Sequence, residues 1–454
     1  MFKIFENVKD LDEKYIRMVE SPVERLICKM AIPTISIMLI SALYNTADTY
    51  FVGWIGTEAT AAVGVSFPLM TLIQALGFFF GQGAGNFISR QMGAQNWDAA
   101  SGMAVTGFLT AIIVGIIMMF LGLIFLTPVA RFLGATEEIL PYTCDYSFYL
   151  FLGAPWMLGS LILNNILRFQ GSAYYSMIGM ISGAVLNIAL DPIFIFVFNM
   201  GVGGAGLATA ISQFVSFCLL LIGCSGKGNI RIKLKMFSPS FIFYKEIVHN
   251  GVPSLFRQGF ASIAVICVNH VAGSFSVAVI AAVSIVQRVT IIANYALIGF
   301  GQGFQPVCGF NFGAKRYDRV KKGFWFCVRV SAVVLSILAV AGYIYAPQII
   351  ALFRRNDPEV ILVGTLALRL QCISFPLMSW VILNNMMLQT IGKAFKASLL
   401  AVSRQGLFLL PVLFILTPYL GVLGIQLSQP IADIATFLLA IPLGIGVLKE
   451  MKEE

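Results

Sequence analysis

The sequence predicts an all-α integral membrane protein with twelve transmembrane helices in two pseudo-symmetric six-helix lobes. Three observations support this fold class. The 454 residues are 58% hydrophobic and only 11% charged, with a mean hydropathy of +0.87, whereas soluble globular proteins carry about 25% charged residues. Twelve apolar segments are each long enough for a helix that crosses about 30 Å of hydrocarbon. The second half of the chain also repeats motifs of the first half.

The apolar segments follow one another with short polar connections. Residues 1–27 are polar and charged and do not resemble a cleavable signal peptide, so the first apolar segment is expected to remain as a span. Several segments exceed the minimum length and are expected to tilt or bend. In order, the expected helices are 30–55, 59–88, 100–127, 142–167, 174–198, 203–224, 248–272, 277–310, 324–346, 360–391, 395–418 and 422–447.

An internal repeat divides the chain into two halves. The stretch FFGQGAGNFISRQMGAQNWDAASG (79–102) matches GFGQGFQPVCGFNFGAKRYDRVKKG (299–323), and LILNN (161–165) matches VILNN (381–385), at a constant offset of 220. We therefore expect a six-helix lobe over 1–224, a linker over 225–247 and a second six-helix lobe over 248–454. Because six spans are an even number, the two lobes form a parallel repeat with a cleft between them.

The distribution of Lys and Arg predicts the orientation. Basic residues concentrate in one set of loops, which includes the linker, Arg90 and Arg168, so this side and both termini are expected to be cytoplasmic. The net charge of +9 therefore reflects membrane topology, and no nucleic-acid partner is expected. The two His residues, His249 and His270, do not have metal-ligand spacing, and the eight scattered Cys are expected to be buried free thiols.

Charged residues inside expected spans are costly, at about 2.5–3.5 kcal/mol each on insertion scales. Asp48 is the clearest example, because it lies within the apolar run LYNTADTYFVG (43–53). Such residues are hypotheses for functional sites. The clearest members of this set are Asp48, Asp191, Arg257, Arg288, Arg404 and Asp433.

Four helices of the first lobe are expected to place oxygen-bearing side chains at one depth. Counting from the outer helix ends puts this layer about 6–11 Å below the outer surface. Its members are Asp48, Tyr146, Asp191 and Thr209, and a second row one turn further inward contains Tyr44 and Asn187.

This layer has the chemistry of a cation site. Two neighbouring carboxylates can share a proton, and carboxylate, amide and hydroxyl oxygens together suit a hard cation such as Na⁺. The second half has Val268 and Pro411 at the positions that correspond to the two acids, so a role common to both lobes is not expected. Alternatively, each Asp could bond a local backbone amide or an Arg, and Asp191 could support a kink at Pro192.

The remaining polar residues could have structural or functional roles. Arg404 and Asp433 are expected to form an ion pair, or else to line the cleft of the second lobe, as Arg257 and Gln258 could. The paired Asn residues at 164–165 and 384–385 are expected to bond between helices. Pro33 should bend the first helix and is a candidate hinge, since a bend there would move the first acid.

Several motifs resemble the MATE (multidrug and toxic compound extrusion) family in its prokaryotic DinF-like branch. They include ADTYFVGWIGTEATAAVG (47–64), GQGAGNFISRQMGAQN (81–96) and LNIALDPIFIF (186–196), and the resemblance covers nearly the whole chain. It implies a monomer in the bacterial cytoplasmic (inner) membrane that exports large, often cationic drugs by cation-coupled alternating access. The implied cation site, with H⁺ or Na⁺ as coupling ion, is Asp48, Asn187, Asp191 and Thr209, and the implied network and drug contacts are Tyr44, Tyr146 and Asn164.

Two other function classes remain for comparison. A flippase for lipid-linked precursors belongs to the same superfamily, but it would be expected to have a large basic cleft and often extra helices. A membrane-embedded enzyme is not expected, because the chain contains neither GxSxG nor HExxH and no His near the two acids. No cofactor is implied, and the sequence does not distinguish Na⁺ from H⁺.

Overall fold

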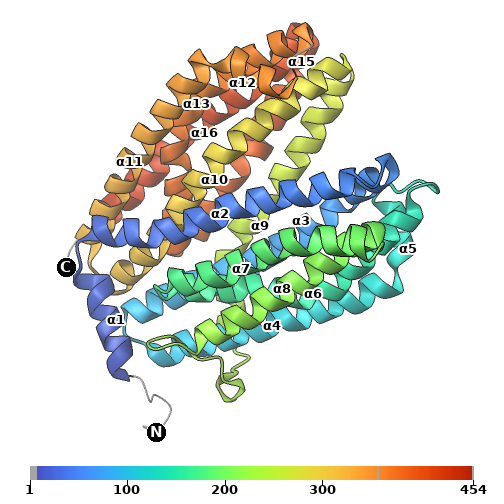
Figure 1. Ribbon diagram of the computed structural model, residues 1–454. Coiled ribbons are helices and arrows are strands. Elements are labelled where there is room, and N and C mark those ends of the chain that lie inside the picture. Colours follow the sequence, from blue (N-terminus) through green and yellow to red (C-terminus); the bar gives the residue numbers. More distant parts are fainter. Residues whose placement is uncertain (1–7, 355–356, 452–454) are drawn as a thin grey trace.

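The structure of the protein is a computed structural model that describes residues 8–354 and 357–451 (Figure 1), and the regular elements of these residues are all helical. The elements are α1 (Val8–Glu20), α2 (Val23–Gly53), α3 (Thr57–Gly93), α4 (Trp97–Ile124), α5 (Leu126–Phe132), α6 (Leu140–Phe169), α7 (Ala173–Pro192), the π-helix η1 (Ile193–Val197), α8 (Gly201–Cys224), the 3-10 helix η2 (Leu234–Met236), α9 (Phe241–Gly273), α10 (Val277–Gly313), α11 (Tyr317–Ile344), α12 (Ala346–Phe353), α13 (Pro358–Thr390), α14 (Ala394–Val402), the π-helix η3 (Ser403–Leu409), α15 (Leu410–Leu420) and α16 (Val422–Glu450).

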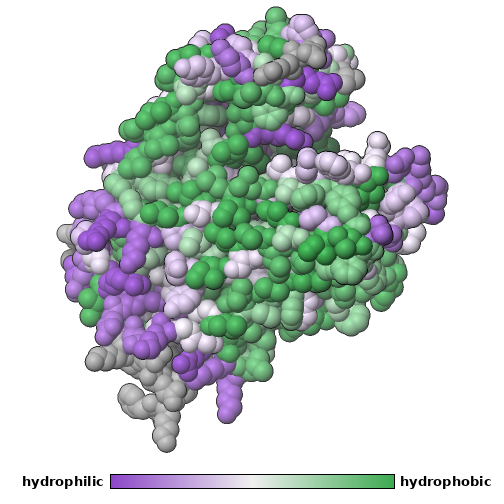
Figure 2. Space-filling model, viewed as in Figure 1, coloured by the Kyte–Doolittle hydropathy of each residue, from purple (hydrophilic) through white to green (hydrophobic). Residues whose placement is uncertain are grey.

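The expected fold class is confirmed. Among the described residues, 12 helical segments are long and apolar enough to cross a membrane. Helix α7 and η1 form one of these spans, and α14, η3 and α15 form another. Apolar residues cover much of the visible surface along the helices, and hydrophilic residues gather at its ends (Figure 2), as expected where lipid surrounds the middle of the molecule. The short helices α1, α5 and α12 lie outside the expected spans.

The spans form two lobes, with α2 to α8 in the N-terminal lobe and α9 to α16 in the C-terminal lobe (Figure 1). The lobes approach each other at the end where α1 and both chain ends lie, which we call the terminal end. They diverge toward the opposite end, which carries α5 and α15 (Figure 1). The closest packing between the lobes is that of α3 on α9 and of α2 on α10.

Equivalent turns in the two lobes show the repeat and correct its register. Gln95 and Lys315 have φ of 57° and 59°, and their numbers differ by 220. The turn glycines Gly171 and Gly392 have φ of 83° and 84°, but their numbers differ by 221. The ungapped offset of 220 is therefore wrong by one residue in this region, because the C-terminal lobe has one additional residue before this turn. The offset returns to 220 at the turn glycine Gly201 (φ 56°) and its counterpart Gly421 (φ 60°).

Small residues allow the two lobes to pack closely near the terminal end. A Cβ added to Gly93 would overlap the carbonyl oxygen of Phe310, and a Cβ added to Gly313 would overlap the carbonyl oxygen of Arg90. Within the repeated GQG motifs, Gly83 lies against the backbone of Ile247 in the opposite lobe. Close approach of this kind is the usual role of small residues between transmembrane helices.

Two arginines add polar contacts between the lobes. The sequence placed Arg90 and Arg168 in loops, but both belong to helices. Arg168 is only 1% exposed, and its Nη1 donates to Gln305 Oε1 of α10 at 3.0 Å. Arg90 pairs with Glu246 of α9 at 2.9 Å and donates to the carbonyl oxygen of Thr390 at 2.8 Å. These arginines were misplaced because hydropathy reports where an apolar run ends, not where the helix ends.

Helix α1 packs across the terminal end of both lobes. On the N-terminal lobe, the buried Lys14 donates to Ser172 Oγ at 2.8 Å and to Asn229 Oδ1 at 2.6 Å. On the C-terminal lobe, Asn311 Nδ2 donates to the carbonyl oxygen of Met18 at 3.2 Å. The helix therefore bridges the two lobes at their closed end.

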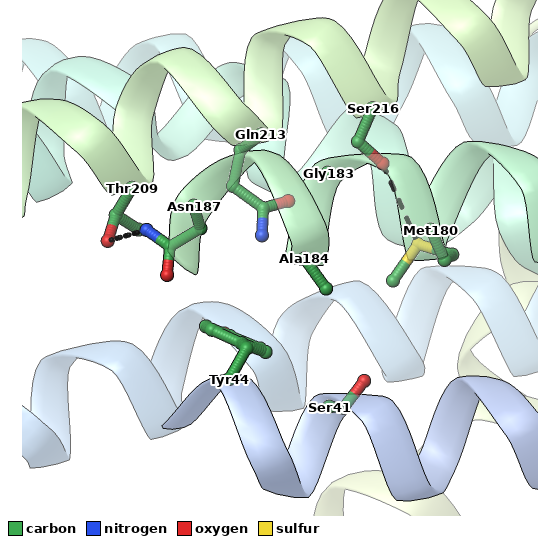
Figure 3. Close-up of a pocket in the computed structure, with 9 residues that line it drawn as sticks. All are labelled: Ser41, Tyr44, Met180, Gly183, Ala184, Asn187, Thr209, Gln213 and Ser216. Carbon is green, nitrogen blue, oxygen red and sulfur yellow. Dashed lines mark hydrogen bonds between the residues drawn. The ribbon is translucent and has the colours of Figure 1, made fainter. Parts of the chain in front are cut away.

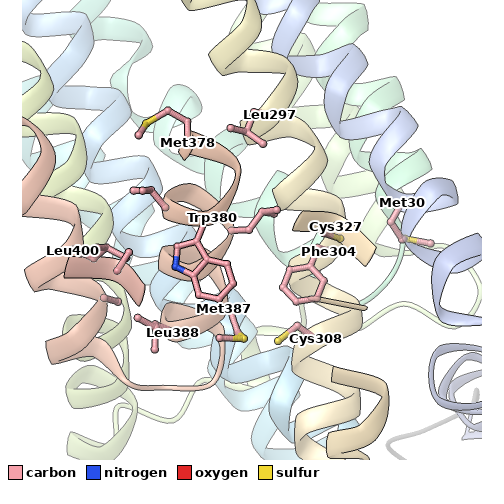
Figure 4. Close-up of a cluster of buried hydrophobic side chains, with 14 of the residues drawn as sticks. Met30, Leu297, Phe304, Cys308, Cys327, Met378, Trp380, Met387, Leu388 and Leu400 are labelled. Atoms are coloured by element: carbon pink, nitrogen blue, oxygen red, sulfur yellow. The ribbon is translucent and has the colours of Figure 1, made fainter. Parts of the chain in front are cut away.

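Buried apolar side chains from both lobes form one large core, and a second cluster, which includes Val52, Tyr146 and Ile195, lies within the N-terminal lobe. Trp380 of α13 belongs to the large core in the C-terminal lobe, with Phe304, Cys308 and Cys327 nearby (Figure 4). Ring contacts join Trp380 to Phe324 at a centroid distance of 5.3 Å. All eight cysteines are free, but they are not all buried as expected, since Cys28 is exposed and three others are half-buried.

We predict that Gly313→Ala destabilises the protein by about 1–3 kcal/mol, because the new methyl group overlaps backbone and forces the lobes apart. Thermal unfolding of the purified protein in detergent measures this. Gly446→Ala is the matched control, since a Cβ at Gly446 meets no atom within 4 Å. Equal unfolding temperatures of the two variants would contradict close backbone packing at this interface.

Lys14 predicts a pH dependence. Burial, with a contribution from the positive charge of Arg17, lowers the pKa of Lys14 from 10.5 to about 7. Between these two pH values the unfolded chain binds more protons at Lys14 than the folded chain, so stability rises with pH across this window. We expect the wild type to gain stability relative to Lys14→Met as the pH rises from about 7 to 10. A difference in unfolding temperature that does not change with pH would refute this prediction.

Candidate functional site

Asp48 belongs to α2 and lies near the end of this helix that is farther from the terminal end. Asp48 is only 6% exposed. Tyr146 of α6 is fully buried, and its hydroxyl lies 3.3 Å from Asp48 Oδ2 and 3.6 Å from Met70 Sδ. The other carboxylate oxygen, Asp48 Oδ1, is buried without a hydrogen-bond partner. Asp48 therefore has one weak donor for two oxygens, although it lies in an apolar part of the lobe.

Asp191 lies near the end of α7 and is fully buried. Asn187, one turn earlier, is placed by its Nδ2, which lies 3.4 Å from Asp191 Oδ1 and 3.3 Å from Thr209 Oγ1 of α8. The chain after Asp191 is unusual, because Pro192 is followed by the π-helix η1. Proline removes a backbone donor, and π-turns occur often at functional sites.

These residues form a cluster with an excess of acceptors, which we call the N-lobe oxygen cluster. It comprises Asp48, Tyr146, Asn187, Asp191 and Thr209. Three of its oxygens are buried and lack partners, namely Asp48 Oδ1, Asn187 Oδ1 and Asp191 Oδ2. Helix α2, which carries Asp48, packs against α7, which carries Asp191. Each unsatisfied buried acceptor costs about 1–3 kcal/mol, more if it is charged, so the cluster is stabilised by gaining a proton or a cation.

The donor set limits which ion fits. Carboxylate, amide and hydroxyl oxygens are ligands for hard cations, and three of them lack partners here. Among the described residues, no group of three or more His, Cys, Asp or Glu is arranged so that it could hold a metal ion. The oxygens fit Na⁺ or a bound proton.

A pocket adjoins the cluster at Asn187 and Thr209 (Figure 3). Figure 3 shows Tyr44 and Ser41 of α2 on one side and side chains of α7 and α8 on the other. Asn187 and Thr209 belong to both the cluster and the pocket wall. The full lining is Ser41, Tyr44, Met180, Gly183, Ala184, Asn187, Thr209, Gln213 and Ser216.

The structure thus brings together most of the residues expected from the sequence. Tyr146 contacts Asp48, Asn187 contacts both Asp191 and Thr209, and Tyr44 lines the adjoining pocket together with Asn187 and Thr209. Sequence reasoning missed Ser41 and Gln213. Ser41 could have been found, since it precedes Tyr44 by three residues and Asp48 by seven, which is one helical face.

Three other candidate residues lie away from the cluster. Asn164 is buried and accepts a hydrogen bond from Ser176 of α7. Arg257 belongs to α9, in the C-terminal lobe, where its Nη1 donates to Asn385 Oδ1 at 3.3 Å. Gln258, the next residue on α9, is half-buried. Roles for these residues in the cleft remain predictions.

Pro33 lies inside α2, which continues through it. The next residue, Thr34, donates to the carbonyl oxygens of Met30 at 3.1 Å and Gly299 at 2.6 Å. Gly299 belongs to α10, so α2 contacts the C-terminal lobe beside Pro33, where the helix lacks a backbone donor. A hinge at Pro33 remains a prediction.

Comparison with known proteins places the chain among transporters. The MatE family model matches residues 33–193 and 253–415. Multidrug export protein MepA of Staphylococcus haemolyticus (strain JCSC1435) is 28% identical over 435 residues, which are 95% of each chain. A solved outward-facing structure of a multidrug resistance MATE family transporter of the MOP superfamily has a TM-score of 0.90 and 26% identity, covering 99% of both chains. A MOP superfamily transporter from Pyrococcus furiosus Vc1 (DSM3638) has a TM-score of 0.90 and 27% identity, covering 97% of this chain and 99% of that chain.

We predict that Tyr146→Phe destabilises the protein by about 1 kcal/mol, because Asp48 loses its hydroxyl donor while the aromatic packing remains. Chemical or thermal unfolding in detergent measures the change. Tyr149→Phe, three residues along the same helix and half-buried, serves as the control and should leave stability nearly unchanged. Equal losses in the two variants would show that the Tyr146 hydroxyl does not stabilise Asp48.

Proposed function

The chain belongs to the MatE family of membrane transporters and is not an enzyme, and we propose that it exports organic drugs in exchange for a small cation, Na⁺ or H⁺. The observation that carries the proposal is the set of three buried, unpartnered oxygens in the N-lobe oxygen cluster. A lobe that is stabilised by a bound cation binds it from one side of the membrane and releases it on the other. The names of the similar MepA proteins, which are multidrug export proteins, support drugs as substrates.

The drug and the cation compete for the N-terminal lobe, and this competition couples drug export to cation import. The pocket beside the cluster shares Asn187 and Thr209 with it and presents Tyr44 as an aromatic wall. An organic cation that approaches the N-terminal lobe is attracted by the carboxylates of Asp48 and Asp191, and a bound Na⁺ or proton cancels that attraction. Inward flow of one charge supplies about 2.3 kcal/mol per 100 mV of membrane potential, which drives the drug outward.

The arrangement of the lobes supports an outward-open state. Polar contacts between the lobes lie toward the terminal end of their helices, including Arg90 with Glu246 and Arg168 with Gln305. The lobes diverge toward the opposite end (Figure 1). In alternating access, the contacts of Arg90 and Arg168 break when the terminal end opens, and the opposite end closes.

The proposed location follows from the similar proteins and from charge. The curated relatives are bacterial, so we place the chain in a bacterial cytoplasmic membrane. The terminal end carries the basic loops, including the linker around Lys227, Arg231 and Lys233. Positive residues favour the cytoplasmic side, so both termini are cytoplasmic in this proposal, and the N-lobe oxygen cluster lies nearer the outer side.

We predict that Asp48→Asn and Asp191→Asn each abolish drug export while leaving the protein folded in the membrane. The amide keeps the shape of the carboxylate but cannot bind a proton or neutralise a cation. Export of a fluorescent organic cation is measured in inverted membrane vesicles, with Na⁺ and pH gradients imposed separately. The gradient that drives uptake identifies the coupling ion.

The matched control is Asp98→Asn, which changes an exposed acid in the first turn of α4 and should transport at the wild-type rate. Membrane levels of all variants are compared by immunoblotting. Wild-type transport by both Asp48→Asn and Asp191→Asn would show that the cluster does not couple cation and drug.

A further inference from the structure

The C-terminal lobe contains a carboxylate whose environment is the opposite of the N-lobe oxygen cluster. Asp433 of α16 is fully buried. Each of its two carboxylate oxygens accepts two hydrogen bonds. Oδ1 accepts from Arg404 Nε and from Gln429 Nε2, both at 2.8 Å. Oδ2 accepts from Gln371 Nε2 and from Ser374 Oγ, both at 2.9 Å. The expected ion pair between Arg404 and Asp433 is therefore present, within a network that satisfies the carboxylate completely.

The turns of the repeat relate this network to the pocket of the other lobe. Asp433 lies twelve residues after the turn glycine Gly421, and Gln213 lies twelve residues after the equivalent Gly201. Gln213 lines the pocket beside the N-lobe oxygen cluster (Figure 3). By the same count, Gln429 of the network corresponds to Thr209 of that cluster.

Arg404 also has a counterpart in the pocket wall. It lies twelve residues after the turn glycine Gly392, and Gly183 lies twelve residues after the equivalent Gly171. Gly183 lines the pocket and has no side chain to fill it. The C-terminal lobe thus places a long cationic side chain where the N-terminal lobe leaves space.

The backbone around Arg404 is adapted to this position. Arg404 lies in the π-helix η3, which interrupts the span formed by α14 and α15. A π-turn inserts one residue into a helix and changes the direction of its side chains, and such turns are frequent at functional sites. The side chain of Arg404 remains 20% exposed while its Nε contacts the fully buried Asp433.

We propose that Arg404 is a tethered cation that occupies, in the C-terminal lobe, the place corresponding to the pocket beside the N-lobe oxygen cluster. The guanidinium group neutralises Asp433 permanently, so this lobe exchanges no cation, and coupling is confined to the N-lobe oxygen cluster. The confinement of coupling to the N-lobe oxygen cluster rests on the proposed function. The occupation of the corresponding place in the C-terminal lobe by Arg404 can be tested separately.

Removing the guanidinium should create a second cation site. In Arg404→Ala, the buried Asp433 loses its counter-ion and keeps only the uncharged donors of Gln371, Ser374 and Gln429. The uncompensated carboxylate attracts a small cation such as Na⁺, or a free guanidinium ion, which reproduces the lost side-chain group. Arg404→Lys retains a tethered charge and serves as the matched control.

The experiment measures binding of radiolabelled guanidinium and ²²Na⁺ to the purified full-length protein in detergent. We expect Arg404→Ala to bind one more cation per protein than wild type, and millimolar guanidinium to raise its unfolding temperature. Arg404→Lys and the double variant Arg404→Ala/Asp433→Asn should not gain this site. Equal cation binding by Arg404→Ala and the double variant would overturn the proposal.

Two further arms keep the test decisive. If Arg404→Ala does not give a monodisperse protein, Arg404→Met, which preserves side-chain length without charge, is measured against Arg404→Met/Asp433→Asn with the same criteria. Repeating the measurement in the Asp48→Asn/Asp191→Asn background separates the two lobes. A gained site that persists there supports Arg404 as a tethered cation, even if the wild type shows no cation binding at the N-lobe oxygen cluster and the proposed function fails.

Discussion

Buried acceptor oxygens without donors are the constraint on which the rest of this structure depends. Asp48 and Asp191 each keep one carboxylate oxygen unpartnered in the apolar interior of the N-terminal lobe. Such groups are expensive in a low-dielectric environment, so the free energy of this lobe depends strongly on whether a proton or cation is present. A state that depends on a ligand in this way can be coupled to transport, whereas a fully satisfied ion pair cannot.

Helix α2 connects that constraint to the contact between the lobes. One part of the helix carries Asp48 and Tyr44, and another part packs on α10 through Thr34. A change of charge at the N-lobe oxygen cluster and a movement at the contact between the lobes therefore both act on helix α2. At the terminal end, Gly93 lies against the backbone of Phe310, and Gly313 lies against the backbone of Arg90. This close packing leaves little room for intermediate positions of the lobes, which favours movement between discrete positions.

The two lobes show how one fold supports two electrostatic roles. Their turns coincide in conformation at Gly171 and Gly392 and again at Gly201 and Gly421. The interiors differ, since Asp48 has one weak donor, whereas Asp433 accepts four hydrogen bonds, one of them from a guanidinium. The difference arises from a few side chains and from the π-helix that carries Arg404, so the fold alone does not assign function to either lobe.

The sequence by itself determined the twelve spans and the repeat, because hydropathy is local and additive along a chain. Only the tertiary structure decided which groups meet: Tyr146 with Asp48, Asn187 with Thr209, and the burial of Arg168. It also decided the shift of one residue at Gly392 and the docking of α1. Hydrogen-bond partners depend on the rotation and packing of helices that are distant in sequence, and these are set by side-chain contacts that no local pattern records.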